Sequence, residues 1–261
     1  MQNRYVGDIG DFGKYYLLKS LCMGNKNEQD FSIGVVWYLV PDENHNDDGK
    51  HIRYLDQNDS NLRRFRDGDP ALYDSLSKIV NAGRRDIKLI RESKVLPDNT
   101  VFYEEPLSFE GMPNNTPAAR NNRVNYRKNW ISKAYEMTLG CDLLFVDPDN
   151  GLEVNSVKSH HKTGPKYTYF EELIPFVNRG QSLVICHHLC RSGPAEVQVE
   201  ERLEQLKKKL KVDNIYPLLY KRGTLRTFFI VPSPQHAELL KERVVRLTQR
   251  IPWKEHFSML P

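Results

Sequence analysis

Two short apolar runs constrain the fold of this chain most strongly. FSIGVVWYLV at residues 31–40 and LLFV at residues 143–146 are apolar at almost every position and rich in β-branched and aromatic side chains. Such runs are typical of strands that are buried on both faces of a parallel sheet. Each run is followed at once by polar turn-forming residues, PDENHNDDGKH in one case and DPDNG in the other. The sequence therefore predicts buried parallel strands that end in polar loops.

The remaining pattern alternates between helical and extended periodicity. Helical spacing of apolar residues predicts helices over residues 11–21, 69–80, 124–139, 167–178, 196–212 and 236–250. Further strands are predicted over residues 87–90, 100–103, 142–147, 182–186, 215–220 and 225–231. This order predicts an α/β fold with three layers, Rossmann-like, with a mostly parallel sheet and a C-terminal antiparallel hairpin.

Length and composition predict one domain. The chain has 261 residues, of which 39% are hydrophobic, so we expect a single α/β domain over residues 1–261 with an irregular basic insertion at about 104–129. No apolar run approaches the roughly 20 residues that span a bilayer. The first residues also lack the apolar core of a secretory signal, so we expect a soluble cytoplasmic protein. Four cysteines are too few for a disulfide scaffold.

Polar side chains follow three of the predicted parallel strands. Asp147, Asp149 and Asn150 follow the strand at 142–147, Asp42 follows the first strong strand, and His188 follows the strand at 182–186. Ligands of open α/β sheets bind outside the carboxyl ends of the strands. The sequence therefore predicts a site at this edge; the alternative is that VDPDNG is an ordinary type I turn.

The VDPDNG stretch at residues 146–151 resembles the catalytic loop of methyltransferases that modify exocyclic amines of nucleic-acid bases. The resemblance implies that Asp147 and Asn150 accept hydrogen bonds from the amine, and that S-adenosylmethionine is the cofactor. The aromatic residue that the motif has in fourth place is replaced here by Asn150. Stacking of the base on this loop is therefore not expected.

The opening RYVGDIGDFGKYYLLKSL is similar to the N-terminus of bacterial ribosomal RNA adenine methyltransferases. The comparable places are held by Gly7, Asp8, Gly10, Asp11 and Lys14. This likeness implies that Gly7, Gly10 and Lys14, with Asp42, build the cofactor end, and that Asp8 and Asp11 belong to the active site.

A second resemblance is to a bacterial family that supplies no established activity. It covers three stretches of this chain: the opening RYVGDIGDFGKY, then VVWYLVPDE, and then DPDNG. The usual glycine-rich turn is missing, since Gly49 is the one glycine after the first strand, although Asp42, Glu43, Asp47 and Asp48 could accept from ribose hydroxyls.

Other activities at the same edge stay open. Asp8, Asp11, Asp147, Asp149 and Glu153 could bind Mg²⁺ for phosphodiester cleavage. Without a metal, Asp147 could activate water in a DNA glycosylase that excises a modified base, while a histidine of the 187–188 pair steadies the departing base. A nucleic-acid-binding module is the non-enzyme alternative. Zinc binding by CHHLCRSG is disfavoured, because adjacent histidines on a strand point to opposite faces.

A basic segment points to nucleic acid as the partner. Residues 114–129 contain no acid, and cations alternate there with amide and aromatic side chains. We expect phosphate contacts from Arg120, Arg123, Arg127, Lys128 and, beside the histidines, Arg191. The basic run at 207–211 lies on the polar face of an amphipathic helix and is expected to be solvated.

Overall fold

A computed structural model describes residues 1–25, 28–43, 49–56, 63–191, 193–250 and 253–260. Its centre is a seven-stranded sheet with the order β2-β1-β3-β6-β8-β7-β9 within these residues. In chain order the strands are β1 (Ile33–Trp37), β2 (Val101–Tyr103), β3 (Leu143–Asp147), β6 (Ser182–His188), β7 (Tyr216–Tyr220), β8 (Arg226–Val231) and β9 (Phe257–Met259). The predicted α/β class is confirmed.

Five of the seven strands run in the same direction. The pairs β2–β1, β1–β3 and β3–β6 are parallel, whereas β8 runs antiparallel between β6 and β7. The predicted C-terminal hairpin is therefore confirmed, and β9, which was not predicted, adds an antiparallel edge strand beside β7. The chain leaves β1 towards β2 on one side and returns to β3 on the other, which makes the carboxyl ends of β1 and β3 the topological switch point.

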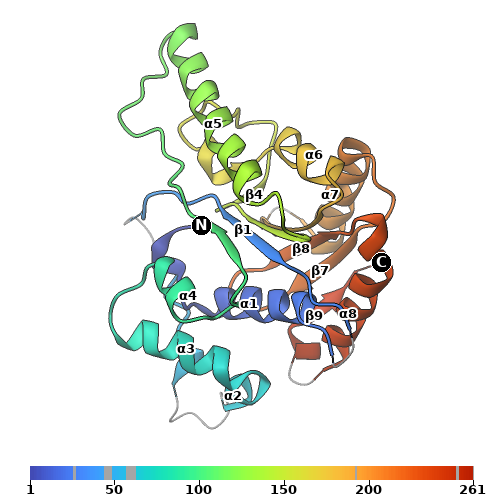
Figure 1. The fold of residues 1–261 in the computed structure, drawn as a ribbon. Coiled ribbons are helices and arrows are strands. Elements are labelled where there is room, and N and C mark those ends of the chain that lie inside the picture. Colours follow the sequence, from blue (N-terminus) through green and yellow to red (C-terminus); the bar gives the residue numbers. More distant parts are fainter. Residues whose placement is uncertain (26–27, 44–48, 57–62, 192, 251–252, 261) are drawn as a thin grey trace.

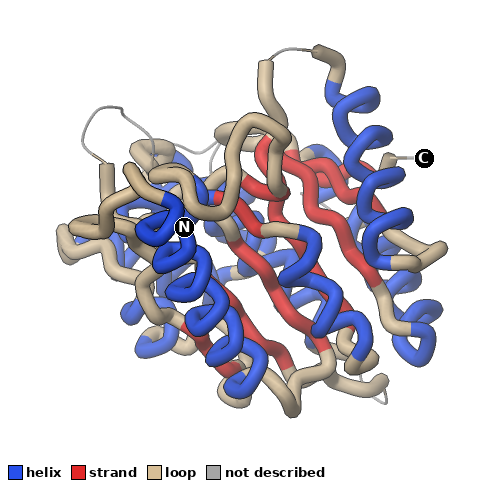
Figure 2. The backbone as a smooth tube through the Cα atoms, turned by 90° about the horizontal axis from the view of Figure 1, so that it is seen from above, coloured by secondary structure: helices blue, strands red, loops and turns tan. Residues whose placement is uncertain are grey.

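Helices cover both faces of the sheet (Figures 1 and 2). One face packs against α1 (Ile9–Cys22), α3 (Pro70–Asn81) and α8 (Ala237–Gln249), with the short α2 (Arg63–Gly68) and α4 (Lys88–Glu92) beside them. The other face packs against α5 (Pro117–Met137), α6 (Phe170–Asn178) and α7 (Ala195–Leu210). Among the described residues, every helix is too short or too polar to span a bilayer.

Two predictions of local structure were wrong, and a third was wrong at its start, because residues 167–168 form a short strand and the helix predicted over 167–178 begins at Phe170. Residues 88–92 form the helix α4, and the predicted strand at 87–90 does not exist. The segment 104–129 is irregular only in its first half, because α5 begins at Pro117 and runs to Met137. The Thr116 side chain caps this helix by accepting from the amide of Ala119 at 3.1 Å.

The start of α5 was missed because its buried stripe is not apolar. The stripe includes Ala119, Arg123, Arg127 and Ile131, four positions that recur every fourth residue. Arginines occupy two of them, so a search for hydrophobic periodicity finds no helix there.

A two-stranded parallel pair joins the acidic loop to a distant segment. β4 (Gly151–Leu152) follows VDPDNG directly and pairs with β5 (Tyr167–Thr168). The amide of Asn150 also donates to the carbonyl of Lys166 at 2.8 Å. The intervening loop 153–166 is thereby folded back beside the acidic turn.

Candidate functional site

A cleft of about 460 Å³ lies at the carboxyl edge of the sheet. This volume is within the range of small-molecule sites, roughly 300–1,000 Å³. The cleft is lined by residues 147–150, by the start of α1, by the end of β6, by the first two turns of α7 and by the turn before β8. Asp147, Asp149, Asn150, Asp8, Asp11, Lys14 and His188 all line it. The structure thus brings together the six residues predicted as catalytic.

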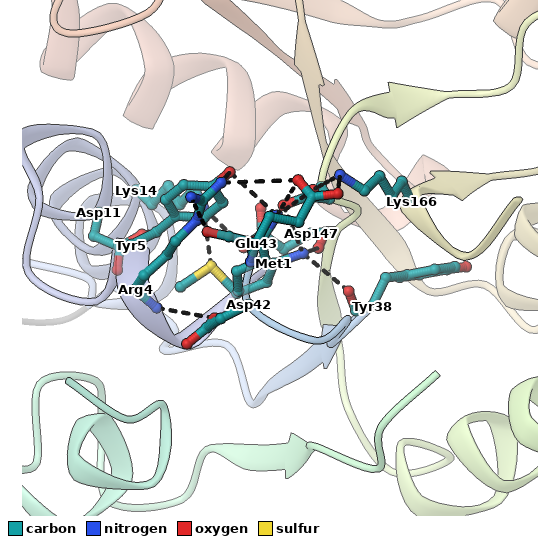
Figure 3. A network of polar contacts seen from close by, with 12 residues as sticks. Met1, Arg4, Tyr5, Asp11, Lys14, Tyr38, Asp42, Glu43, Asp147 and Lys166 are labelled. Carbon is teal, nitrogen blue, oxygen red and sulfur yellow. Dashed lines mark hydrogen bonds and ion pairs between the residues drawn. The ribbon is translucent and has the colours of Figure 1, made fainter. Parts of the chain in front are cut away.

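A buried ion-pair cluster joins α1 to β3 at the centre of the cleft. The Lys14 Nζ atom lies 2.8 Å from Asp147 Oδ2 and 3.3 Å from Asp11 Oδ1 (Figure 3). Asp11 and Lys14 are one helical turn apart, so both reach the same strand end. All three side chains are at least 95% buried. Lys14 therefore holds Asp147 in one orientation.

Burial and neighbouring charges shift the pKa values of Lys14 and Asp11 in this cluster. Burial alone would lower the pKa of Lys14, but the carboxylates of Asp147 and Asp11 outweigh it and raise that pKa, so the ammonium stays charged. Burial raises the pKa of the Asp11 carboxyl to about 7, although Lys14 pulls it down. Asp11 is therefore a carboxyl group that can exchange a proton near neutral pH.

Asp149 lies on the other side of the same turn, in contact with the first residues of the chain. Its Oδ2 accepts from Gln2 Nε2 at 2.8 Å and lies 3.3 Å from Lys166 Nζ. The Met1 amino group donates to the carbonyls of Tyr38 and Asp147 (Figure 3). Burial raises the pKa of Asp149, but the Met1 amino group and Lys166 outweigh this effect and lower it. Met1 and Gln2 therefore tie the acidic turn to the end of β1, and Met1 also lines the cleft.

The two histidines at the end of β6 point to opposite faces, as strand alternation predicts. His188 is on the face of Asp147 and pairs across the ladder with Arg226 of β8. Burial lowers the pKa of His188 well below its ordinary value, and the charge of Arg226 acts in the same direction. His188 is therefore a neutral imidazole, and within the described chain no hydrogen bond to its ring is formed.

His187 faces the other half of the cleft. Its Nδ1 atom accepts from the amide of Leu152 at 3.1 Å, and Val154, Tyr167 and Arg202 line the same cleft. Tyr167 supplies an aromatic side chain beside VDPDNG, where Asn150 had replaced the expected one. Its position comes from the pairing of β4 with β5, and no local signal in the sequence predicts that pairing.

Gly7, Gly10 and Asp42, predicted to bind a cofactor, make packing contacts or hydrogen bonds within the protein. A Cβ atom at Gly10 would lie 2.3 Å from the guanidinium of Arg226, and one at Gly7 would lie 2.5 Å from Val80. These glycines allow close packing of the start of α1 and do not form an open cradle. Asp42 is exposed and accepts from the amide of Arg4 at 3.2 Å, outside the cleft. Asp47 and Asp48 lie outside the described residues.

The predicted cofactor end offers S-adenosylmethionine no open glycine cradle. Gly7 and Gly10 pack against Val80 and Arg226, and Lys14 is held between two buried carboxyl groups. A glycine pattern in the sequence does not distinguish close packing from ligand binding.

A magnesium site built from the same acids does not fit either. Lys14 already occupies the space between Asp11 and Asp147, and Glu153 lies apart, where it accepts from the amide of Phe170 at 3.4 Å. In the described part of the chain, no three His, Cys, Asp or Glu side chains are arranged to hold a metal ion. Zinc at the two histidines lacks a ligand set for the same reason.

Two of the predicted phosphate contacts are buried. Arg127 pairs with Glu172 of α6 at 2.6 Å and donates to the carbonyls of Gly164 and Tyr167, so it fixes α5 to the body of the protein. Arg123 donates to the carbonyls of His160 and Met112. Neither arginine can contact a phosphate without breaking these bonds. Arg120, Lys128 and Arg191 are exposed.

The fold and this cleft are at present the evidence for function, since no protein-family model and no curated protein matches the chain.

Proposed function

We propose that this protein is a hydrolase that releases a base from a nucleotide unit of nucleic acid without an added cofactor. The observation that carries the proposal is the shared cleft of Asp147 and His188. Asp147 is held by buried Lys14, and His188 lies on the same face of the neighbouring strand. In the hydrolysis of a C–N glycosidic bond, a positioned carboxylate can accept a proton from the attacking water, and a neutral imidazole can donate a hydrogen bond to the departing base.

The charges of the cleft favour this chemistry over phosphoryl transfer. Acids outnumber Lys and Arg side chains in its lining, which contains Asp8, Asp11, Asp147, Asp149 and Glu201 against Lys14, Arg202 and Arg226. Glycoside hydrolysis passes through a transition state with positive charge on the sugar, which carboxylates stabilise. Phosphoryl transfer develops negative charge, which the same carboxylates would oppose.

The roles of the residues follow from their contacts. Water adds to the anomeric carbon, the C–N bond breaks, and its electron pair goes to the base nitrogen. Asp147 takes the proton of the attacking water, and Asp11, whose pKa is about 7, shares Lys14 with it and can receive that proton. His188 donates a hydrogen bond to the departing base. The proton lost by the water balances the proton that the base nitrogen finally takes up.

Methyl transfer is the second candidate, and one observation favours it. VDPDNG follows a strand at the switch point, and an antiparallel hairpin closes the parallel part of the sheet, as in the methyltransferases that the sequence resembles. Fold alone does not determine function. The glycines at the start of α1 are closely packed and form no cradle for the cofactor, so we rank this candidate second.

The exposed side of α5 is the proposed contact for the nucleic-acid backbone. It presents Arg120, Lys128 and Lys133 together with four asparagines and the half-exposed Tyr126, and its first acid is Glu136. Cations, amides and an aromatic ring are the groups that bind phosphates and stack on bases. Figure 1 shows that α5 extends beyond the body of the protein, so a long polymer can reach it.

Base release is the direct test of the reaction. Single- and double-stranded oligonucleotides, plain and deaminated, are incubated with the protein, and free base is measured by chromatography beside alkali-labile strand breaks. We expect Asp147→Asn and His188→Gln each to reduce release by about 10²- to 10⁴-fold with the fold intact. Wild-type release in Asp147→Asn would refute the assignment. Absence of base release, together with S-adenosylmethionine binding in calorimetry, would replace hydrolysis by methyl transfer.

Salt-dependent binding tests the partner. The triple variant Arg120→Gln, Lys128→Gln, Lys133→Gln should weaken oligonucleotide binding and reduce the slope of log K against log salt by about two to three. The matched control changes Lys207, Lys208 and Lys209 to Gln on α7, which carries the other basic run. Equal effects of the two triple variants would show non-specific attraction and exclude α5 as the contact.

A further inference from the structure

One imidazole in the cleft wall has a fixed proton position. His187 Nδ1 accepts the hydrogen bond of the Leu152 amide at 3.1 Å. A nitrogen that accepts from an amide carries no proton, so a neutral His187 ring carries its proton on Nε2. Burial lowers the pKa of His187 to about 3, and the charge of Arg202 acts in the same direction. The ring is therefore a hydrogen-bond donor throughout the physiological pH range.

The last glycine of VDPDNG is required by this contact. Gly151 has a φ of +116°, and a Cβ atom there would lie 2.2 Å from His187 Nδ1. Any other residue would push the ring away from the Leu152 amide or strain the backbone. The motif thus serves the orientation of His187 as well as the position of Asp147.

The donor at Nε2 faces the cleft without a partner. His187 is 93% buried, since its relative exposure is 7%, and it lines the cleft. Its ring forms a hydrogen bond at Nδ1, and in the described part of the chain nothing accepts from Nε2. Nε2 is not fully enclosed, because the fully buried polar atoms that lack a partner do not include it. It is therefore accessible from the cleft that His187 lines. A buried polar group of this kind normally has a partner, which points to a ligand.

We infer that His187, Tyr167 and Val154 form a subsite for a planar nucleobase that presents an oxo oxygen to His187 Nε2. Tyr167, which pairs with Gly151 next to His187, offers an aromatic ring, and Val154 offers an apolar surface in the same cleft. A fixed N–H group donates a hydrogen bond to a C=O oxygen and disfavours an amino group in the same place, because two donors would face each other. The subsite therefore selects bases with an oxo group over their amino counterparts. The identity of the ligand as a base rests on the proposed function, whereas the state of His187 does not.

The first experiment reads the imidazole itself. In ¹⁵N NMR spectra of the protein between pH 5 and 7.5, His187 should show an unprotonated Nδ1 and a protonated Nε2, without titration. Addition of inosine monophosphate should shift the Nε2 resonance. A proton on Nδ1, or titration near pH 6, would overturn the inference whatever the protein binds.

The second experiment compares inosine monophosphate with adenosine monophosphate, which differ at the edge of the purine ring. Calorimetry should give about tenfold tighter binding of the inosine compound, the effect of one hydrogen bond. His187→Phe should abolish this ratio, and the control His161→Phe, a half-buried position that does not line the cleft, should leave it unchanged. If His187→Phe does not fold, the wild-type ratio and the NMR spectra still decide.

The outcomes separate this inference from the proposed function. Base release without a preference for the oxo base would refute the subsite and leave the hydrolase standing. Failure of both nucleotides to bind, together with no base release, would refute both. If His187→Phe still binds inosine monophosphate more tightly than adenosine monophosphate, the subsite is also refuted, because another residue must then distinguish the two bases.

Discussion

Replacement of Lys14 by methionine tests whether the ion-pair cluster is organised as described. The substitution keeps most of the side-chain volume and removes one charge that contacts two buried carboxyl groups, at 2.8 Å from Asp147 and 3.3 Å from Asp11. Removing one partner of a buried ion pair costs about 3–5 kcal/mol, because the remaining charge is left without compensation. Total stabilities of natural domains are about 5–15 kcal/mol, so the variant should fold but be strongly destabilised.

Urea unfolding at pH 7.5, followed by tryptophan fluorescence, measures this loss. The double variant Lys14→Met, Asp147→Asn removes the uncompensated carboxylate and should recover about 1–3 kcal/mol of the unfolding free energy. The matched control is Lys19→Met in the same helix. Lys19 pairs with Asp69 where both side chains are partly exposed, so its loss should cost at most about 1 kcal/mol. Equal costs at positions 14 and 19, or no recovery in the double variant, would refute a buried charge cluster.

Three further predictions use the same unfolding assay. The pKa of His187 in the folded protein, about 3, is below its value of 6.5 in an unfolded chain, so protons favour unfolding as the pH falls. Between pH 6 and 4, the unfolding free energy of the wild type should fall by about 1.4 kcal/mol per pH unit because of His187, and His187→Phe should abolish this part of the fall. An unchanged pH dependence in the variant would contradict the assigned pKa. Arg127→Gln should cost about 3–5 kcal/mol through loss of the Glu172 pair; a loss below about 1 kcal/mol would contradict its structural role. Gly13→Ala should cost about 1–3 kcal/mol, because a Cβ atom there would lie 2.4 Å from the ring of the buried Tyr220, and no cost would mean that α1 packs less closely there.

The sheet divides the cleft into two halves with different chemistry. Alternation along β6 sends His188 towards Asp147 and α1, and His187 towards Tyr167 and α7. The first half contains the charged and titratable groups Asp11, Lys14 and Asp147 together with His188. The second half contains the Tyr167 ring, the apolar Val154 and the Nε2 donor of His187. A nucleotide lying across the strand ends would place its glycosidic bond in the first half and its base in the second.

Much of this arrangement follows from local patterns in the sequence. Apolar runs at 31–40 and 143–146 identify buried parallel strands, and the rule that ligands bind at carboxyl ends of such strands brings Asp147 and His188 to one edge. The alternation of side chains along a strand also predicts that His187 and His188 point to opposite faces. These inferences succeed because they depend on periods of two or 3.6 residues, which neighbouring residues determine.

Other parts of the site depend on contacts between residues far apart in the chain. Arg127 was expected on the surface, but Glu172 and two carbonyl groups compensate its burial. Tyr167 was not predicted to reach the acidic turn, because β4 and β5 are too short to be recognised by pattern.

The sequence by itself determined the layers, the strands and the edge at which polar groups collect, since these follow from periodicity and turn chemistry. Only the tertiary structure decided which charges compensate one another: Lys14 with Asp147, and Asp149 with Lys166 and Gln2. A carboxylate at a strand end can bind a metal, a cofactor or a lysine. Which of these it binds depends on distances of a few ångströms between helix α1 and strand β3, and the sequence pattern does not specify them.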